Sequence, residues 1–171
     1  MRSIVKSGMV VRSMGILALL VLASMLLGCE DSIQVQTAAP ALSDAKVTVA
    51  GQSLDGLTIH QGEYEGVVRY EARLVDAQGV PMSGYRVRVQ VEKPGMMGGM
   101  HPPMDEFYCY DDSTHGDPMP GDGIYCYADS SREYGCHRAG AQPGGYHYDF
   151  CGVDGHGHES NHMGVSVSLQ R

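Results

Sequence analysis

Polar and apolar side chains alternate along two long segments of the chain. In residues 64–76, apolar positions are separated by arginine and glutamate, and in residues 85–93 a tyrosine and three valines are separated by arginine and glutamine. A period of two places apolar side chains on one face of an extended segment and polar side chains on the other. Both segments are therefore predicted to be β-strands with one buried face. The glycines and proline of residues 76–84 predict a connection between neighbouring strands.

Five shorter segments show the same period, namely residues 46–50, 107–110, 124–127, 146–150 and 165–169. Beyond residue 28, the sequence has no helical pattern of ten residues or more. About seven short strands separated by glycine- and proline-rich connections are typical of a β-sandwich of two antiparallel sheets. The sequence therefore predicts an all-β fold.

Residues 107–127 contain two aromatic segments, Phe-Tyr-Cys-Tyr and Ile-Tyr-Cys-Tyr, on either side of an acidic loop. Glycine, proline and aspartate in that loop favour turns. The pattern predicts a β-hairpin, in which Cys109 and Cys126 occupy matching positions in two paired strands.

The first 28 residues have the features of an export signal. Arg2, Lys6 and Arg12 precede thirteen mostly apolar residues, fewer than the roughly 20 that a membrane span needs. The segment ends in Leu-Leu-Gly-Cys, which resembles the lipobox of bacterial lipoproteins. This resemblance implies that Cys29 is acylated, becomes the first mature residue and anchors the chain to a membrane. The expected location is the bacterial cell envelope, on the extracytoplasmic side of a membrane.

Removal of residues 1–28 leaves 143 residues, a size typical of one domain. Residues 29–44 show no sustained period and are predicted to form a flexible tether, which assigns residues 45–171 to the β-sandwich domain. The mature chain has 9 basic and 20 acidic side chains. This acidic balance argues against nucleic acid as a partner.

Four cysteines follow Cys29 in the sequence, and they are Cys109, Cys126, Cys136 and Cys151. An even number of cysteines in an exported chain indicates two disulfides. Four cysteines allow three pairings. The predicted hairpin favours the pairing of Cys109 with Cys126 and of Cys136 with Cys151.

The loop of the predicted hairpin contains four aspartates, Asp111, Asp112, Asp117 and Asp122. Ca²⁺ binds several oxygen ligands, so these carboxylates, with Thr114 and backbone carbonyls, form a candidate calcium site. The alternative is that the aspartates accept hydrogen bonds from backbone N–H groups and fix the shape of the loop.

Residues 64–93, followed by Asp-Asp-Ser-Thr-His-Gly-Asp and Gly-Asp-Gly-Ile-Tyr within residues 111–125, resemble bacterial extracytoplasmic immunoglobulin-like domains. Many of those domains carry a similar Asp-Asp-Gly-Thr-x-Gly-Asp and Gly-Asp-Gly-x-Tyr segment, with glycine where this chain has Ser113. The likeness continues through residues 145–148 and covers about the last 110 residues. It implies a single immunoglobulin-like β-sandwich. It implies no particular activity, because such domains share a fold and not a function.

Two further segments are rich in thioether and imidazole groups. The first contains Met96, Met97, Met100, His101 and Met104, and the second contains His156, His158, His162 and Met163. Such ligands suit copper and zinc ions. The alternative is that the methionines pack over one end of the sandwich and that the histidines are solvated.

Residues 158–162 match the His-Glu-x-x-His pattern of zinc peptidases, which requires both histidines on one face of a helix. The surrounding glycines and the strand that follows disfavour a helix, so no enzymatic activity is predicted and a peptidase is the most distant hypothesis. The leading hypothesis is a lipid-anchored binding or structural module of the cell envelope, with the membrane and another envelope protein as partners. A copper- or zinc-binding envelope lipoprotein is the second hypothesis.

Overall fold

Nine β-strands and one short 3₁₀ helix, Gly135–His137, make up the regular structure of the described residues. The structure is a computed structural model that describes residues 39–95 and 104–171. The strands are β1 (Ala41–Val49), β2 (Gln52–Ser53), β3 (Thr58–His60), β4 (Val68–Val75), β5 (Arg86–Glu92), β6 (Met104–Cys109), β7 (Ile124–Asp129), β8 (Gly144–Val153) and β9 (Glu159–Gln170).

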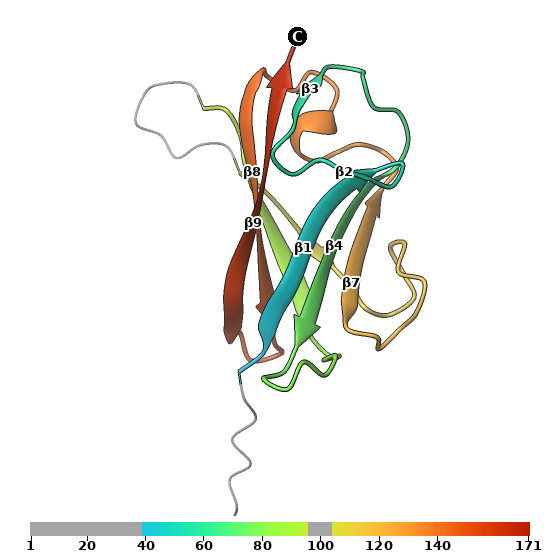
Figure 1. Cartoon of the computed structure of the whole chain (residues 1–171), viewed down its shortest axis with the longest axis vertical. Helices are drawn as coiled ribbons and strands as arrows, with labels where there is room; N and C mark the ends of the chain where they lie inside the picture. Colours follow the sequence, from blue (N-terminus) through green and yellow to red (C-terminus); the bar gives the residue numbers. More distant parts are fainter. Residues whose placement is uncertain (1–38, 96–103) are drawn as a thin grey trace, which may run out of the picture. The chain divides into compact units, whose positions relative to one another are not determined.

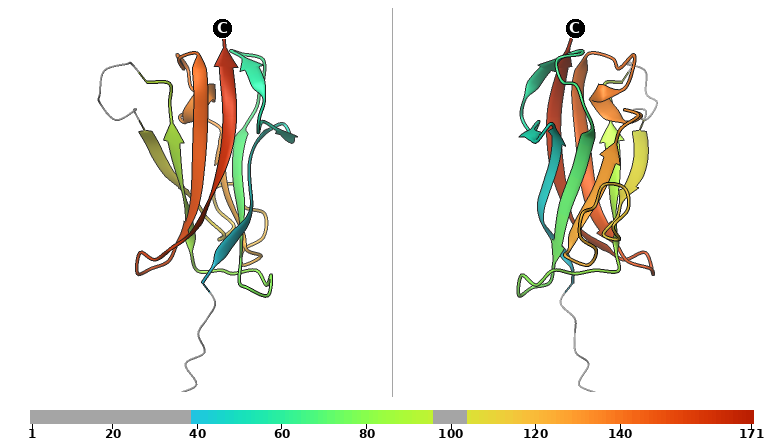
Figure 2. Two further views of the ribbon diagram at one scale, coloured as in Figure 1. Left: turned by 60° about the vertical axis from the view of Figure 1, so that its left-hand side comes forward. Right: turned by 90° about the vertical axis from the view of Figure 1, so that its right-hand side faces the viewer.

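The strands form two sheets that lie in two layers (Figures 1 and 2). Sheet A has the order β2-β1-β4-β7, and all of its neighbours are antiparallel. Sheet B has the order β3-β9-β8-β5-β6 and is antiparallel except that β3 runs parallel to β9. The prediction of an all-β fold with two sheets is confirmed. The short strands β2 and β3 were not predicted, because two or three residues are too few to show a period.

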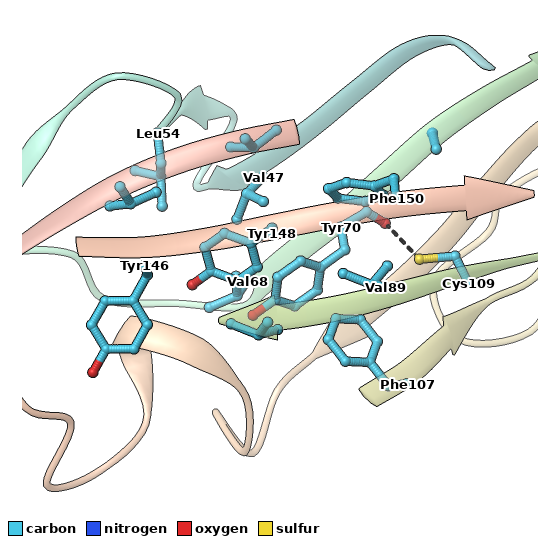
Figure 3. Packing of buried hydrophobic residues seen from close by; sticks show 14 of the residues in the cluster. Val47, Leu54, Val68, Tyr70, Val89, Phe107, Cys109, Tyr146, Tyr148 and Phe150 are labelled. Atoms are coloured by element: carbon cyan, nitrogen blue, oxygen red, sulfur yellow. Dashed lines mark hydrogen bonds between the residues drawn. The ribbon is translucent and has the colours of Figure 1, made fainter. Parts of the chain in front are cut away.

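Aromatic side chains join the inner faces of the two sheets (Figure 3). The ring of Tyr70 in β4 lies 4.7 Å from that of Phe107 in β6 and 5.7 Å from that of Tyr148 in β8, measured between ring centroids. The buried phenol of Tyr148 donates a hydrogen bond to Cys136 Sγ at 3.2 Å, and that of Tyr70 donates to the Tyr134 carbonyl at 3.4 Å. The core can therefore include tyrosines without leaving their hydroxyl groups unpaired.

The alternation predicted for the two long strands is confirmed. In β4, Val68, Tyr70, Ala72 and Leu74 are buried, and in β5, Val87, Val89 and Val91 are buried. The intervening polar side chains lie on the outer faces of the two sheets. The outer face of sheet B carries two of the candidate sites described below.

The predicted hairpin of residues 107–127 is wrong. β6 pairs with β5 in sheet B, whereas β7 pairs with β4 in sheet A. The two arms meet at one isolated bridge, in which Tyr110 and Cys126 exchange backbone hydrogen bonds of 2.9 and 3.0 Å. The aspartate loop therefore carries the chain from one sheet to the other, and it does not turn the chain back within one sheet.

The predicted disulfide between Cys109 and Cys126 is also wrong, since both residues are free thiols. Cys109 belongs to the core, where its Sγ lies 3.7 Å from the Tyr70 carbonyl oxygen. Cys126 lies on the outer face of sheet A, with its Sγ 3.6 Å from a carboxylate oxygen of Glu71. Cysteines whose Cβ atoms point to opposite faces cannot be bridged without backbone movement.

The second predicted disulfide fails for the same reason. Cys136 is a free thiol in the core beside Tyr148, and Cys151 is a free thiol of β8 that lies outside the core cluster. Cys151 is opposite Arg88 of β5 and His162 of β9, both on the outer face of sheet B. The sheet therefore separates the two sulfur atoms.

The folded domain begins earlier than predicted, because β1 starts at Ala41, within the predicted tether of residues 29–44. The predicted signal peptide of residues 1–28 and the lipidation site Cys29 lie outside the described residues, so both stay predictions. Within residues 39–95 and 104–171, no helix is long and apolar enough to cross a membrane.

Candidate functional site

Three carboxylates converge in the aspartate loop between β6 and β7. One oxygen atom from each of Asp111, Asp117 and Asp122 lies within 4.8 Å of the other two. Asp117 is almost fully buried, with 5% of its surface exposed. The convergence of several oxygen atoms is the geometry that a calcium site needs.

Backbone N–H groups of the same loop already bind these oxygen atoms. Asp117 accepts hydrogen bonds from Ser113 at 2.8 Å and from Met119 at 3.0 Å, one to each carboxylate oxygen. Both oxygens of Asp111 likewise accept hydrogen bonds from the N–H groups of two loop glycines. The carboxylates therefore fix the backbone of the loop, which is the structural alternative to calcium binding.

The other two aspartates of the loop bind backbone groups close to them in sequence. Asp122 accepts a hydrogen bond from the Ile124 N–H at 2.8 Å, and Asp112 accepts one from the Thr114 N–H at 2.9 Å. A further hydrogen bond from the Thr114 hydroxyl lowers the pKa of Asp112. Asp112 is not part of the group of three converging carboxylates.

Four residues of the methionine-rich segment, Met96, Met97, Met100 and His101, lie outside the described residues, and Met104 is the first residue of β6. The prediction that this segment binds a copper or zinc ion therefore stays a prediction.

Two of the candidate histidines belong to an exposed turn between β8 and β9. Asp154 accepts hydrogen bonds of 2.8 Å from the backbone N–H groups of both His156 and His158. The His158 ring also binds the Asp154 carboxylate at 2.8 Å, and this hydrogen bond lowers the pKa of Asp154 to about 2. The rings of His156 and His158 lie 6.1 Å apart. These hydrogen bonds stabilise the conformation of the turn.

The His-Glu-x-x-His segment is not helical. His158 belongs to the turn, whereas Glu159 and His162 belong to strand β9. The two histidines bind different aspartates, Asp154 and Asp149. These residues therefore lack the helical face that the peptidase motif requires.

A second convergence of ligand-type side chains lies on the outer face of sheet B. The Sγ of Cys151, a carboxylate oxygen of Glu159 and a ring nitrogen of His162 lie within 4.8 Å of one another. Cys151 is 1% exposed, whereas Glu159 and His162 are exposed. We call these three residues the β8–β9 cluster.

A β-bulge produces this cluster. Cys151 pairs with His162, and Val153 pairs with Glu159, so one extra residue of β9 lies between the two pairs. In a regular strand, residues three apart point to opposite faces, and the extra residue brings Glu159 and His162 onto the same face. The hydroxyl of Ser160 accepts a 2.8 Å hydrogen bond from the Gly152 N–H and so replaces the lost backbone partner.

Neighbouring charged groups orient two members of the β8–β9 cluster. Arg88 donates a 2.7 Å hydrogen bond to one carboxylate oxygen of Glu159, and Asp149 contacts the Nδ1 atom of His162 at 2.7 Å. The Nε2 atom of His162 then lies 3.6 Å from the other carboxylate oxygen of Glu159. The Nε2 atom of His162 and the second carboxylate oxygen of Glu159, neither of which is bound by Asp149 or Arg88, therefore point toward one another.

The outer face of sheet B also contains an open groove of about 450 Å³, near the end of the sheet where β3 joins β9. Its wall includes Ser166 and Ser168 of β9, His147 of β8 and Lys93 after β5. His147 hydrogen-bonds through Nδ1 to Ser166 Oγ at 3.0 Å. A Cβ atom at Gly164 would approach the His147 ring to 2.4 Å, so a glycine there gives the ring its space.

Sequence reasoning identified His162 but missed its partners. Cys151 was assigned to a disulfide, and Asp149 and Arg88 were treated only as polar positions in alternating strands. The pairing of β5 with β8 places Arg88 opposite Cys151, and this pairing has no local signal in the sequence. The groove also depends on strand order and was not predicted.

A scan against protein-family models and a search of curated proteins found no match to this chain.

Proposed function

We propose that this chain is an exported, lipid-anchored immunoglobulin-like domain that acts as a binding module at the bacterial cell envelope. The groove on the outer face of sheet B carries the proposal, because binding sites are concave surfaces with a few polar groups of defined position. Another envelope protein is the partner that the proposed location favours.

The order of the strands supports the immunoglobulin-like part of the proposal. In immunoglobulin-like sandwiches, the first, second and fifth main strands share one sheet, and the third, sixth and seventh share the other. Here β1, β4 and β7 are neighbours in sheet A, while β5, β8 and β9 are neighbours in sheet B, with β6 at the edge. The short strand β3 pairs with the last strand in parallel.

The backbone of the aspartate loop gives further support. Ser113 stands where the resembled segment has glycine, and it has a φ of 63°, in the left-handed region that glycine favours. The loop therefore has a glycine-like backbone at this position in spite of the serine. Its carboxylate hydrogen bonds hold that conformation.

The lipid anchor is tested with a Cys29→Ala variant of the full chain. If Cys29 is acylated, the wild-type protein partitions into the detergent phase and the variant is neither lipidated nor processed at this position. Mass spectrometry of the mature N-terminus provides the measurement. A variant that matures normally and stays in the detergent phase contradicts the anchor.

The groove is tested with Ser166→Tyr, which fills it, and with Ser43→Tyr as a matched control in β1 of sheet A. Both serines are exposed. Sedimentation of each purified protein with washed envelope fractions measures binding. We expect Ser166→Tyr to reduce binding at least about tenfold, equivalent to about 1.4 kcal/mol, and Ser43→Tyr to leave it unchanged. Equal binding by both variants rules out the groove.

A further inference from the structure

The β8–β9 cluster combines three kinds of metal ligand. Cys151 offers a thiol sulfur, Glu159 a carboxylate oxygen and His162 an imidazole nitrogen. Sulfur, nitrogen and oxygen ligands of this kind are those that bind zinc in proteins. Calcium and magnesium prefer oxygen ligands alone, so the donor set favours a transition metal.

The spacing of the donor atoms also suits zinc. Zinc–ligand bonds of about 2.0–2.3 Å at tetrahedral angles place donor atoms about 3.3–3.6 Å apart. The Nε2 atom of His162 and the nearer oxygen of Glu159 are 3.6 Å apart, and one ligand-type atom from each of the three residues lies within 4.8 Å of the other two. Small rotations of the exposed Glu159 and His162 side chains would bring the donor atoms to the distances of a zinc site.

Asp149 and Arg88 contact the proposed ligands in the way that supporting residues of known metal sites contact theirs. A metal-bound histidine commonly donates its other ring N–H to a carboxylate, which fixes the ring and its tautomer. Asp149 occupies that position at Nδ1 of His162, so Nε2 is free for a metal. Arg88 occupies one oxygen of Glu159 and leaves the second oxygen facing His162.

The charges of the site balance a divalent cation. A Cys151 thiolate, Glu159 and Asp149 supply three negative charges, and Arg88 supplies one positive charge. The remaining two negative charges equal the charge of one Zn²⁺. The thiol proton leaves to solvent when the metal binds. The contacts of Cys151 Sγ with the carbonyl oxygens of Gly152 and Ser160, at 3.6 and 3.8 Å, are weak enough to be exchanged for a metal bond.

We propose that Cys151, Glu159 and His162 bind one Zn²⁺ ion on the outer face of sheet B, with a water molecule as fourth ligand and Asp149 as a positioning residue. The site joins β8 to β9 at the bulge. It goes beyond the binding module proposed above, which requires no metal. It is also distinct from the methionine- and histidine-rich segments, with which it shares only His162.

Metal binding to the purified full chain tests the proposal. After treatment with a chelator, Zn²⁺ is titrated in competition with a chromophoric chelator, and Co²⁺ is used as a spectroscopic substitute. We expect one ion per chain with a dissociation constant below about 1 μM, equivalent to about −8.2 kcal/mol. We also expect a thiolate-to-cobalt charge-transfer band. Weaker binding, or a band-free Co²⁺ spectrum, overturns the proposal.

Two cysteine variants locate the sulfur ligand. Cys151→Ser should remove the charge-transfer band and weaken Zn²⁺ binding at least about tenfold. Cys126→Ser is the matched control, because Cys126 also lies on an outer face beside a glutamate and an arginine. It should leave the band and the affinity unchanged. A band that survives in Cys151→Ser, or that disappears in Cys126→Ser, contradicts the assignment.

Variants of the nitrogen and positioning groups separate this site from the turn histidines. His162→Ala should abolish binding, and His158→Ala should not change it. Asp149→Asn should weaken Zn²⁺ binding about tenfold while the charge-transfer band persists, as expected for a residue that acts through His162. Loss of binding in His158→Ala with retention in His162→Ala would place the metal in the turn. Circular dichroism checks that each variant is folded.

Discussion

The aspartate loop and the β8–β9 cluster each bring three ligand-type side chains within 4.8 Å, but they use their donor atoms differently. In the loop, both oxygens of Asp111 and of Asp117 accept backbone N–H groups. In the cluster, Arg88 binds only one carboxylate oxygen of Glu159, and Asp149 binds only the Nδ1 atom of His162. The other carboxylate oxygen and the Nε2 atom remain available to a ligand. Proximity alone therefore does not identify a ligand site, because the existing partners of each donor atom decide what remains available.

The difference follows from the local backbone. The loop has no regular ladder, so its N–H groups require acceptors, and the aspartates supply them. The cluster lies on a sheet, where neighbouring strands already satisfy most backbone groups. Polar side chains on such a face are free to contact one another or a ligand. This contrast predicts large structural effects in the loop and smaller ones in the cluster.

The largest effect is expected at Asp117. Replacement by alanine removes the almost fully buried carboxylate and leaves the N–H groups of Ser113 and Met119 without their acceptor in a partly buried part of the loop. The expected loss is about 2–3 kcal/mol in the free energy of unfolding, measured by urea denaturation of the full chain. Asp122→Ala, which removes one hydrogen bond to Ile124, should cost about 1 kcal/mol or less. Equal costs for the two variants would contradict this view of the loop.

A smaller effect is expected at Asn161, in the bulge of β9. Its side-chain amide accepts a hydrogen bond from the Leu42 N–H at 2.6 Å and donates one to the Leu42 carbonyl at 3.2 Å. Asn161→Ala should lower the free energy of unfolding by about 1–2 kcal/mol. Because the bulge aligns Glu159 with His162, the same variant should also weaken Zn²⁺ binding. Unchanged stability would show that the bulge holds without this link.

The smallest effect is expected from Ca²⁺. Since backbone N–H groups already bind the loop carboxylates, millimolar Ca²⁺ should change the Tm by less than about 1 °C relative to chelator, or under about 0.5 kcal/mol. Differential scanning calorimetry of the full chain provides the measurement. A rise of several degrees that Asp117→Asn abolishes would establish the loop as a calcium site and remove the contrast with the β8–β9 cluster.

The sequence predicted the positions of the long strands correctly but did not predict which strands pair with one another. The alternation in β4 and β5 identifies a buried face, because a half-buried strand must separate apolar from polar side chains along its own length. The same alternation in residues 107–110 and 124–127 does not identify the neighbouring strand. Adjacent position and matched cysteines suggested a hairpin, yet β6 pairs with the preceding strand β5. The disulfide prediction depended on that pairing and failed with it.

Among the candidate sites, contacts between residues close in sequence were predictable, and contacts that depend on strand pairing were not. The hydrogen bonds of Asp112 and Asp122 join residues two positions apart, and such turn contacts are encoded locally. The β8–β9 cluster requires strand pairing and a bulge. The sequence predicted a strand only over residues 165–169, so neither the extension of β9 to Glu159 nor the bulge that brings Glu159 and His162 onto one face was predicted.

The first strands of the domain have a consequence for self-association. β9 is the longest strand of the described residues, and an unpaired strand edge is a template on which other chains add. The parallel strand β3 covers the C-terminal part of that edge. Two further backbone hydrogen bonds extend the cover, from the Gly56 N–H to the Ser166 carbonyl and from the Ser168 N–H to the Leu57 carbonyl. Asn161 joins the other end to β1. Proteolytic removal of residues 41–60 would therefore uncover β9 and favour intermolecular sheet growth.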